Sequence, residues 1–247
     1  MADVLLAARG VSVRFGGLLA VDGVDVDVSE RELIGIIGPN GAGKTTFFHT
    51  LSGLLRPTAG RLTVRGHDLT GRPPHVFAAH GIARTFQTPR VFREMTAEAN
   101  VRFGLEFEGR RRRHPHDAFD DARSILAFLG LADAASVPAG ALTPARQRLL
   151  EIGMAFSARP DVLLLDEVAA GLSERELETT AALIRRVRDE LGVAVVWIEH
   201  AVRALMGVVE RVIVLHQGRK IADGPPAAVA RDPAVIDAYL GGEGGTA

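Results

Sequence analysis

The fold is decided by one stretch of the sequence, Gly38-Pro39-Asn40-Gly41-Ala42-Gly43-Lys44-Thr45-Thr46. This stretch matches the pattern G-x-x-x-x-G-K-[S/T] at every required position. Residues 33–37 (LIGII), just before it, predict a short buried strand, and residues 45–51 (TTFFHTL) predict the first turns of a helix. A strand, a glycine-rich loop and a helix in this order indicate a phosphate-binding loop.

The residue types of this loop suit the triphosphate of ATP. Glycines lack a Cβ and tolerate positive φ, so the backbone can curl and turn its N–H groups toward an anion. The positive end of the following helix faces the same point. We expect Lys44 to contact the β- and γ-phosphates and the hydroxyl of Thr45 to bind Mg²⁺. A glycine-rich turn with a chance lysine is the alternative, and the flanking strand and helix argue against it.

Composition places limits on the rest of the chain. Its 247 residues, 47% hydrophobic and 24% charged, suit one large domain or a domain with a sub-domain. A net charge of −1 gives no general attraction to nucleic acid, and the absence of cysteine excludes disulfides and thiolate metal sites. No apolar run approaches the roughly 18 residues that span a bilayer. The early acid Asp3 and the lack of a basic start argue against a signal peptide. We therefore expect a cytoplasmic protein whose membrane role, if any, comes through a partner.

The N-terminal part alternates between apolar and polar residues with period two. Residues 11–15 and 23–28 predict half-exposed antiparallel strands. Phe15, before a Gly16-Gly17 turn, has two interpretations of about equal weight, a core aromatic and a stacking platform for adenine. Gln87 follows the strand predicted over residues 81–86, and a lone glutamine in a loop is usually a plain surface residue.

The middle of the chain has helical spacing. We predict a helical sub-domain over residues 88–158, inserted into an α/β core formed by residues 1–87 and 159–247. One apolar face of it comprises Ala118, Ala122, Ile125, Leu126 and Leu129. The basic run Arg110-Arg111-Arg112-Arg113 favours a solvated loop or frayed helix end, with contact to anionic headgroups or an acidic partner as the alternative.

Two further strands end in polar residues. After Asp161, the apolar stretch 162–165 runs into Asp166 and Glu167, and ligands bind at the carboxyl ends of such buried parallel strands. Asp166 is placed to hold Mg²⁺, and Glu167 to orient or deprotonate an attacking water. Residues 193–198 predict another buried strand, followed by His200. A histidine there is more often structural, but next to the carboxylate pair it would reach a γ-phosphate.

Taken together, these features are similar to the ATP-binding subunit of an ABC transporter over almost the whole chain. Within that family the chain resembles the ATPases of branched-chain amino-acid importers. The residues that carry this resemblance are 15–21 (FGGLLAV), 81–87 (GIARTFQ), 169–172 (AAGL) and 232–240 (DPAVIDAYL). Residues 150–154 (LEIGM) also resemble the urea-importer ATPases. The resemblance implies a P-loop NTPase core of α/β class with an antiparallel β sub-domain and an inserted helical sub-domain.

The resemblance also implies a role for single residues. Phe15 matches the aromatic residue that stacks on adenine, and Gln87 matches the glutamine that senses Mg²⁺ and contacts the transmembrane partner. Asp166 matches the metal carboxylate, Glu167 the catalytic base and His200 the histidine at the γ-phosphate. Residues 170–173 match the segment that crosses the seam between two ATPase subunits.

One segment departs from the family pattern. Where the family has a Leu-Ser-x-Gly-Gln signature that clasps the γ-phosphate of the opposite subunit, this chain reads LTPARQ over residues 142–147. Thr143 keeps a hydroxyl and, with Pro144, makes a good helix start. Ala145 replaces a glycine, so we expect its Cβ to clash with phosphate or its backbone to refuse the required φ and ψ. Val168 and Ser173 are smaller departures. The hypothesis is a weakened signature that makes the two sites of a heterodimer unequal.

The sequence thus predicts an ATPase that dimerises around ATP and Mg²⁺ on the inner face of the cell membrane. Its predicted partners are permease subunits, a second identical or different ATPase subunit and, indirectly, a solute-binding protein, with no nucleic acid. Branched-chain amino acids are the favoured solutes, and urea, amides or other polar solutes are the alternative. The rivals are a soluble ABC ATPase of DNA repair, translation or cluster assembly, a weakly hydrolytic regulatory subunit, and an exporter subunit. Tandem ATPase cores, long coiled-coil insertions and fused membrane helices, which would favour a soluble role or an exporter, are absent from the sequence.

Overall fold

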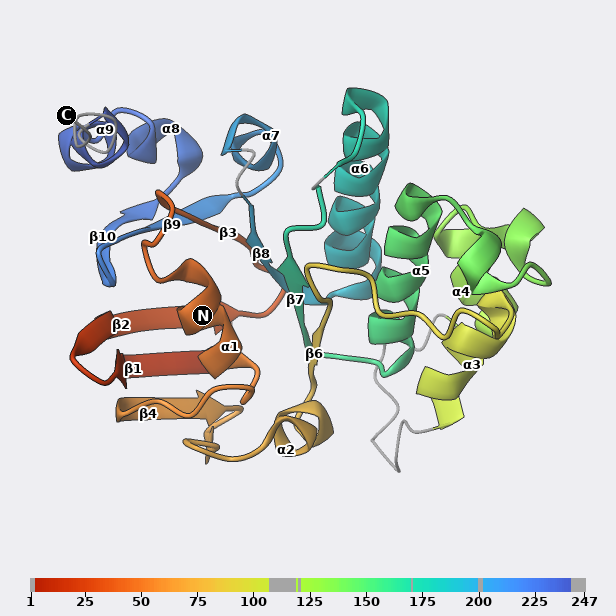
Figure 1. The fold of residues 1–247 in the computed structure, drawn as a ribbon, viewed down its shortest axis with the longest axis horizontal. Helices are drawn as coiled ribbons and strands as arrows, with labels where there is room; N and C mark the ends of the chain where they lie inside the picture. Colours follow the sequence, from red (N-terminus) through yellow and green to blue (C-terminus); the bar gives the residue numbers. More distant parts are fainter. Residues whose placement is uncertain (1–2, 107–118, 120, 170, 200–201, 241–247) are drawn as a thin grey trace.

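The structure is a computed structural model that describes residues 3–106, 119, 121–169, 171–199 and 202–240. Two sheets and a group of helices build it (Figure 1). Across these described residues, no helix combines the length and the apolar character that a membrane crossing requires. The basic run at residues 110–113 and Ala118 lie outside the described residues.

The first sheet is antiparallel, with strand order β2-β1-β4-β5. Its strands are β1 (Val4–Phe15), β2 (Leu18–Ser29), β4 (Ala59–Val64) and β5 (His67–Asp68). Both β1 and β2 are much longer than predicted. Strict alternation misses the first half of β1, because Leu5, Leu6, Ala7 and Ala8 are buried in succession. Register shifts between β1 and β2 interrupt the alternation there.

The second sheet has the order β10-β9-β3-β8-β7-β6. Its strands are β3 (Leu33–Ile37), β6 (Ile82–Arg84), β7 (Val162–Asp166), β8 (Ala194–Ile198), β9 (Arg211–His216) and β10 (Arg219–Gly224). Neighbouring strands are parallel, except that β10 returns antiparallel to β9. The carboxyl ends of β3, β7 and β8 therefore meet at one edge of the sheet.

Both faces of the second sheet are buried, which explains why its central strands are wholly apolar. Along β7, Val162 and Leu164 pack into a core shared with the antiparallel sheet. Leu163 and Leu165 pack on the other face, against the helices. Helix α1 (Lys44–Leu51) contributes Phe47, Phe48 and Leu51 to the first of these cores.

The remaining helices fall into two groups. Between β6 and β7 lie α3 (Ala97–Glu106), α4 (Ala122–Phe128), the short η1 (Ala132–Ala134) and η2 (Ala139–Ala141), and α5 (Pro144–Ser157). They gather on the right of Figure 1, within the segment predicted to be helical. The other helices are α2 (Pro74–Ala79), α6 (Glu174–Leu191), α7 (Val202–Met206), α8 (Pro226–Val229) and α9 (Pro233–Leu240). The boundaries of the sub-domains stay a prediction.

Candidate functional site

The loop between β3 and α1 has a backbone that only glycine accommodates. Gly38, Gly41 and Gly43 have φ values of 153°, 76° and 94°. A Cβ at Gly38 would collide with the carbonyl oxygen of Leu215, and one at Gly43 with that of Ala20. No side chain caps the N-terminus of α1, so that helix end presents N–H donors and a positive dipole end to a ligand.

Lys44 lies within this loop. Its Nζ donates to the carbonyl oxygens of Gly38 at 2.7 Å and Pro39 at 3.0 Å. Burial lowers the pKa of Lys44, and the Glu167 carboxylate, which is close enough to raise that pKa, opposes the effect. The ammonium is thereby fixed beside the loop that would receive phosphates.

A cavity of about 520 Å³ opens over the loop. Its lining joins the antiparallel sheet and the β9–β10 turn to the loop, and it includes Phe15, Leu18, Asn40, Gly41, Ala42, Gly43, Lys44, Thr45, Thr46, Gln217 and Gly218. Phe15 is 51% exposed, so it is a wall of the cavity and not a core residue. Of its two sequence interpretations, this position favours the stacking platform. The sequence analysis did not place Gln217 and Gly218 at this cavity, because they lie far from the phosphate loop along the chain.

The two acids after β7 are both buried and differently held. Asp166 pairs with Arg84 at 3.0 Å, and its N–H donates to the hydroxyl of Thr85 at 3.1 Å. Burial raises the pKa of Asp166, while Arg84 lowers it in part. Arg84 in turn packs over the rings of Phe48 and Phe86. Sequence reasoning missed Arg84, whose only signal was a charge on an otherwise apolar strand.

Glu167 is held in a strained backbone conformation. Its φ is +49°, in the left-handed region that costs a non-glycine residue roughly 1–2 kcal/mol. Gln87 Nε2 donates to Glu167 Oε2 at 2.7 Å, and the Glu167 N–H donates to the carbonyl oxygen of Ile198 at 3.0 Å. The turn therefore fixes the carboxylate at the edge of the sheet, next to Lys44.

Helix α5 holds the segment that carries Gln87. Arg148 donates to the carbonyl oxygens of Phe86 and Gln87, both at 2.7 Å. Glu151 Oε1 accepts the N–H groups of Phe86 at 3.2 Å and Arg90 at 3.0 Å. Burial raises the pKa of Glu151 against these hydrogen bonds. Neither α5 side chain could be singled out from the sequence, since both lie in an amphipathic helix.

Helix α5 begins within residues 142–147, the segment that departs from the family signature. Thr143 is the N-cap, with its hydroxyl accepting the Arg146 N–H at 3.4 Å, and Pro144 is the first helical residue. Ala145 is helical and is not among the described residues with positive φ. The helical backbone suits alanine in this structure, and the conflict with the phosphate of a second subunit stays a prediction. Neither Thr143 nor Ala145 lines the cavity over the loop.

Two residues predicted to lie at the site are not among those that the structure describes. His200 and Ala170 lie outside the described residues. Next to His200, Glu199 is 2% exposed, and its Oε1 accepts the Ala169 N–H at 2.6 Å and the Trp197 Nε1–H at 3.3 Å. Glu199 thus ties the end of β8 to the chain after β7, a role that the sequence did not single out.

The oxygen atoms that this chain offers suit Mg²⁺, which would be coordinated by the protein and by the substrate phosphates together. The predicted donors Thr45, Gln87 and Asp166 offer oxygen atoms, and Thr45 is exposed in the cavity lining. Among the described residues, no group of three or more His, Cys, Asp or Glu side chains could hold a metal alone.

The fold and site define a nucleotide-binding ATPase with a phosphate loop after the central strand β3 and a helical insertion before β7. Family models for the ABC transporter ATPase and for the branched-chain amino acid ATP-binding cassette transporter match residues 21–170 and 219–245, respectively. The chain belongs to the ABC transporter family, and it is an ATP-hydrolysing nucleotide-binding protein.

Its relatives cover the chain almost completely. It is 40% identical to the branched-chain amino acid transport ATP-binding protein BraF of Pseudomonas aeruginosa, covering 98% of this chain and 99% of that protein. It is 39% identical to the corresponding protein LivG of Escherichia coli K12, with the same coverage. A solved ABC transporter cassette in its ADP conformation superposes with a TM-score of 0.85 at 28% identity, covering 97% and 99% of the two chains. The predicted family and fold class are confirmed.

Proposed function

We propose that this chain is the ATPase subunit that energises a membrane importer of branched-chain amino acids. The observation that carries the proposal is end-to-end similarity to BraF and LivG, together with the match of residues 219–245 to a model specific to that transporter type. These relatives are named for branched-chain amino acid transport. The similarity extends beyond the phosphate loop, which many unrelated ATPases share.

The geometry supports in-line attack of water on the γ-phosphate. The loop N–H groups and Lys44 hold the phosphates, and Thr45, Gln87 and Asp166 would hold Mg²⁺, which neutralises phosphate charge when bound. Glu167 is placed to orient the attacking water and accept its proton. The left-handed turn at Glu167 and the hydrogen bond from Gln87 fix that carboxylate before substrate arrives.

Gln87 also supports a route from the site to a permease. Its side chain bonds Glu167, while Arg148 of α5 bonds its backbone. A shift of the helical segment would therefore change the position of the Glu167 carboxylate. We infer that a permease subunit contacts the chain near Gln87 and that ATP hydrolysis moves this contact.

The position of the α5 N-terminus supports a dimer. Thr143 and Pro144 are exposed, and Thr143 and Ala145 are not part of the cavity in their own chain. We infer that they face the nucleotide of a second ATPase subunit. The pair would lie on the inner face of the membrane beneath two permease subunits, and a solute-binding protein would deliver the solute to those permeases. Urea or amide import remains the alternative for the solute, on the residues LEIGM at 150–154.

Ala145 supports a second candidate, a weakly hydrolytic subunit that pairs with a more active one. Its Cβ adds bulk at the helix end that would approach a partner's phosphate. The intact Lys44, Asp166 and Glu167 argue for hydrolysis in the chain's own site.

The test is transport in proteoliposomes that contain this chain with its co-purified permeases and binding protein. We expect ATP-dependent uptake of leucine, isoleucine or valine, and none with Glu167→Gln in place of the parent chain. Uptake of urea without uptake of these amino acids would replace the solute assignment. Co-purification with soluble partners alone would contradict a role in transport.

A further inference from the structure

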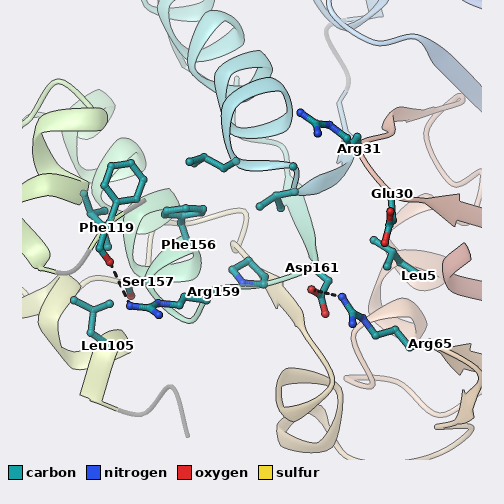
Figure 2. Close-up of a pocket in the computed structure, with 15 residues that line it drawn as sticks. Leu5, Glu30, Arg31, Arg65, Leu105, Phe119, Phe156, Ser157, Arg159 and Asp161 are labelled. Carbon is teal, nitrogen blue, oxygen red and sulfur yellow. Dashed lines mark hydrogen bonds and ion pairs between the residues drawn. The ribbon is translucent and has the colours of Figure 1, made fainter. Parts of the chain in front are cut away.

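An ion pair between an arginine and an aspartate lies at each end of strand β7. Just before the strand, Asp161 pairs with Arg65 at 2.7 Å (Figure 2), beside a cavity lined by the residues that precede β3, β7 and β8. At the carboxyl end of the strand, Asp166 pairs with Arg84 at 3.0 Å. The two pairs have the same chemistry, but only the second includes a residue that is predicted to bind Mg²⁺. The mechanism proposed above uses Asp166 and gives Arg84 no role.

Hydrogen bonds fix the guanidinium of Arg84 between two elements. Nη2 donates to Asp166 Oδ2 at 3.0 Å, Nη1 to the hydroxyl of Ser52 at 2.9 Å, and Nε to the carbonyl oxygen of Thr85 at 3.1 Å. Ser52 is the C-cap of α1, the helix that starts in the phosphate loop, and its hydroxyl donates to the carbonyl oxygen of His49 at 3.2 Å. Arg84 therefore joins the end of β7 to the end of α1.

The same guanidinium packs on two aromatic rings. It lies 5.4 Å from the centroid of Phe48 and 4.7 Å from that of Phe86. The guanidinium of Arg90 also lies over the Phe86 ring, at 4.0 Å. Only 11% of the Arg84 side chain is exposed, so these rings and the hydrogen bonds replace most of its hydration. The orientation of Arg84 thus depends on where Phe86 lies.

The carboxylate of Asp166 depends on Arg84 for its own orientation. Its side chain is 5% exposed, and among the described residues Arg84 is the only one that hydrogen-bonds its carboxylate. Because Oδ2 accepts from Arg84, Oδ1 is the oxygen left for Mg²⁺, directly or through water. Groups that hydrogen-bond a metal-binding carboxylate orient it, and their loss typically weakens metal affinity about 10–100-fold.

We propose that Arg84 is a positioning residue for ATP hydrolysis, which orients the Asp166 carboxylate toward the Mg²⁺ of bound ATP. A planar guanidinium suits this task, because its rigid fork of N–H groups bonds Ser52 and Asp166 at once. The inference rests on the proposed mechanism, in which Asp166 holds Mg²⁺, and it does not depend on which solute is imported.

Arg84 also connects Asp166 to the segment that carries Gln87. Phe86 packs on the guanidinium, and Arg148 of α5 donates to the Phe86 carbonyl oxygen at 2.7 Å. On another side, Phe86 lines a cavity of about 270 Å³ between α2, β6 and α5, so its ring is not packed all round. A shift of Phe86 would change the support of Arg84 and, with it, the metal carboxylate. Movement of the helical segment would thereby reach both acids after β7.

The first experiment measures how much Mg²⁺ strengthens ATP binding. Titration calorimetry of the purified full chain, carrying Glu167→Gln so that ATP persists, gives the Kd of ATP in EDTA and in saturating Mg²⁺, and their ratio is the Mg²⁺ gain. We expect Arg84→Met, which fills the space beside the rings without the charge, to reduce this gain about tenfold or abolish it. An unaltered gain would overturn the proposal. A larger gain would overturn it too, because Arg84 would then only repel the metal ion.

Two further variants separate orientation from stability and from charge. Arg65→Met is the matched control, because it removes the same kind of pair from the other end of β7 (Figure 2). We expect it to leave the Mg²⁺ gain unchanged, whatever its melting temperature, and a reduced gain would overturn a specific role for Arg84. Arg84→Lys keeps the charge and lacks the fork, so we expect a reduced gain here as well. A gain equal to that of the parent would show that charge alone is sufficient and would overturn the orienting role.

Phe86→Leu tests the connection to the Gln87 segment. Leucine keeps an apolar side chain and removes the ring that supports the guanidinium, so we expect a smaller Mg²⁺ gain than in the parent. A gain equal to the parent's would overturn the connection through Phe86 and leave the role of Arg84 standing. If the parent itself shows no Mg²⁺ gain, the proposed binding of Mg²⁺ by Asp166 is wrong, whereas a parental gain that survives Arg84→Met overturns this inference alone.

Discussion

At the scale of single residues, Glu151 shows how burial and hydrogen bonding compete. Its Oε1 accepts two backbone N–H groups of the Gln87 segment, while its Oε2 is buried without a hydrogen-bond partner and lies 3.6 Å from Arg148. Burial outweighs these contacts and raises the pKa above its ordinary value of 4.5. The segment that presents Gln87 is thus fixed by a carboxyl group whose ionisation is unfavourable in the fold.

Replacing this acid should change how stability depends on pH. An acid whose pKa is raised in the folded chain stabilises the fold most below its unfolded pKa, and that contribution is lost as pH rises through the folded pKa. We expect the free energy of unfolding of the parent, relative to Glu151→Gln, to fall as pH rises above 4.5. Urea unfolding of both chains across pH 4 to 8 measures this difference. Parallel curves would contradict the raised pKa.

Ala145 carries the second prediction at this scale. Because its backbone is helical, only its Cβ can obstruct a partner's phosphate. We expect Ala145→Gly to raise kcat of the reconstituted ATPase, since relief of about 1 kcal/mol of crowding corresponds to roughly fivefold in rate. A steady-state assay over a range of ATP concentrations checks this. Unchanged kcat and ATP dependence would remove the idea of a weakened signature.

Among the helices, α5 contacts several of the segments that matter for function. It begins within residues 142–147, where the sequence departs from the family signature. Its side chain Arg148 then holds the backbone of Gln87. Its close crossing with α3 depends on Gly104, where a Cβ would collide with the Ser157 hydroxyl and lie 3.1 Å from the Met154 carbonyl oxygen. The close approach of α5 to α3 therefore requires a residue without a side chain at position 104.

Gly104→Ala tests that crossing. Alanine favours an isolated helix over glycine by about 1 kcal/mol, so propensity alone would stabilise the chain. We expect the clash to win and to lower the free energy of unfolding by about 1–3 kcal/mol, measured by urea denaturation. Gly224→Ala at the end of β10 is the control, because its Cβ would meet nothing within 4 Å. A stabilised Gly104→Ala chain would show that α3 and α5 can separate without loss.

At the scale of the whole molecule, the nucleotide cavity joins parts that the sequence separates widely. Phe15 of β1, the loop after β3 and the β9–β10 turn all line it. A nucleotide that binds there contacts both sheets, so it should stabilise the folded chain as a unit.

ATP should therefore raise the melting temperature. At about a hundred times its Kd, a ligand adds about 2.7 kcal/mol, which is roughly 5–10 °C for a chain of this size. We expect this rise for Glu167→Gln, which retains bound ATP, and a much smaller one for AMP, which lacks the phosphates that Lys44 would contact. Differential scanning fluorimetry measures it. An equal rise with AMP would contradict phosphate recognition by the loop.

Local sequence patterns are enough to predict the phosphate loop, the two acids at the end of an apolar strand and the class of the fold. These follow from short-range chemistry, because the spacing of glycines, a lysine and a hydroxyl is sufficient to define a loop that receives phosphates. Alternation predicted parts of β1 and β2, and continuous apolar runs predicted β3, β7 and β8. The first half of β1 was missed because it buries consecutive residues.

Which distant residues meet depends on how the elements pack. The strand order β3-β8-β7-β6 sets β6 beside β7 and so brings Gln87 to Glu167. The crossing of α5 over that edge places Arg148 on the Gln87 backbone. Such contacts arise from the packing of whole elements, which no local pattern of residues encodes.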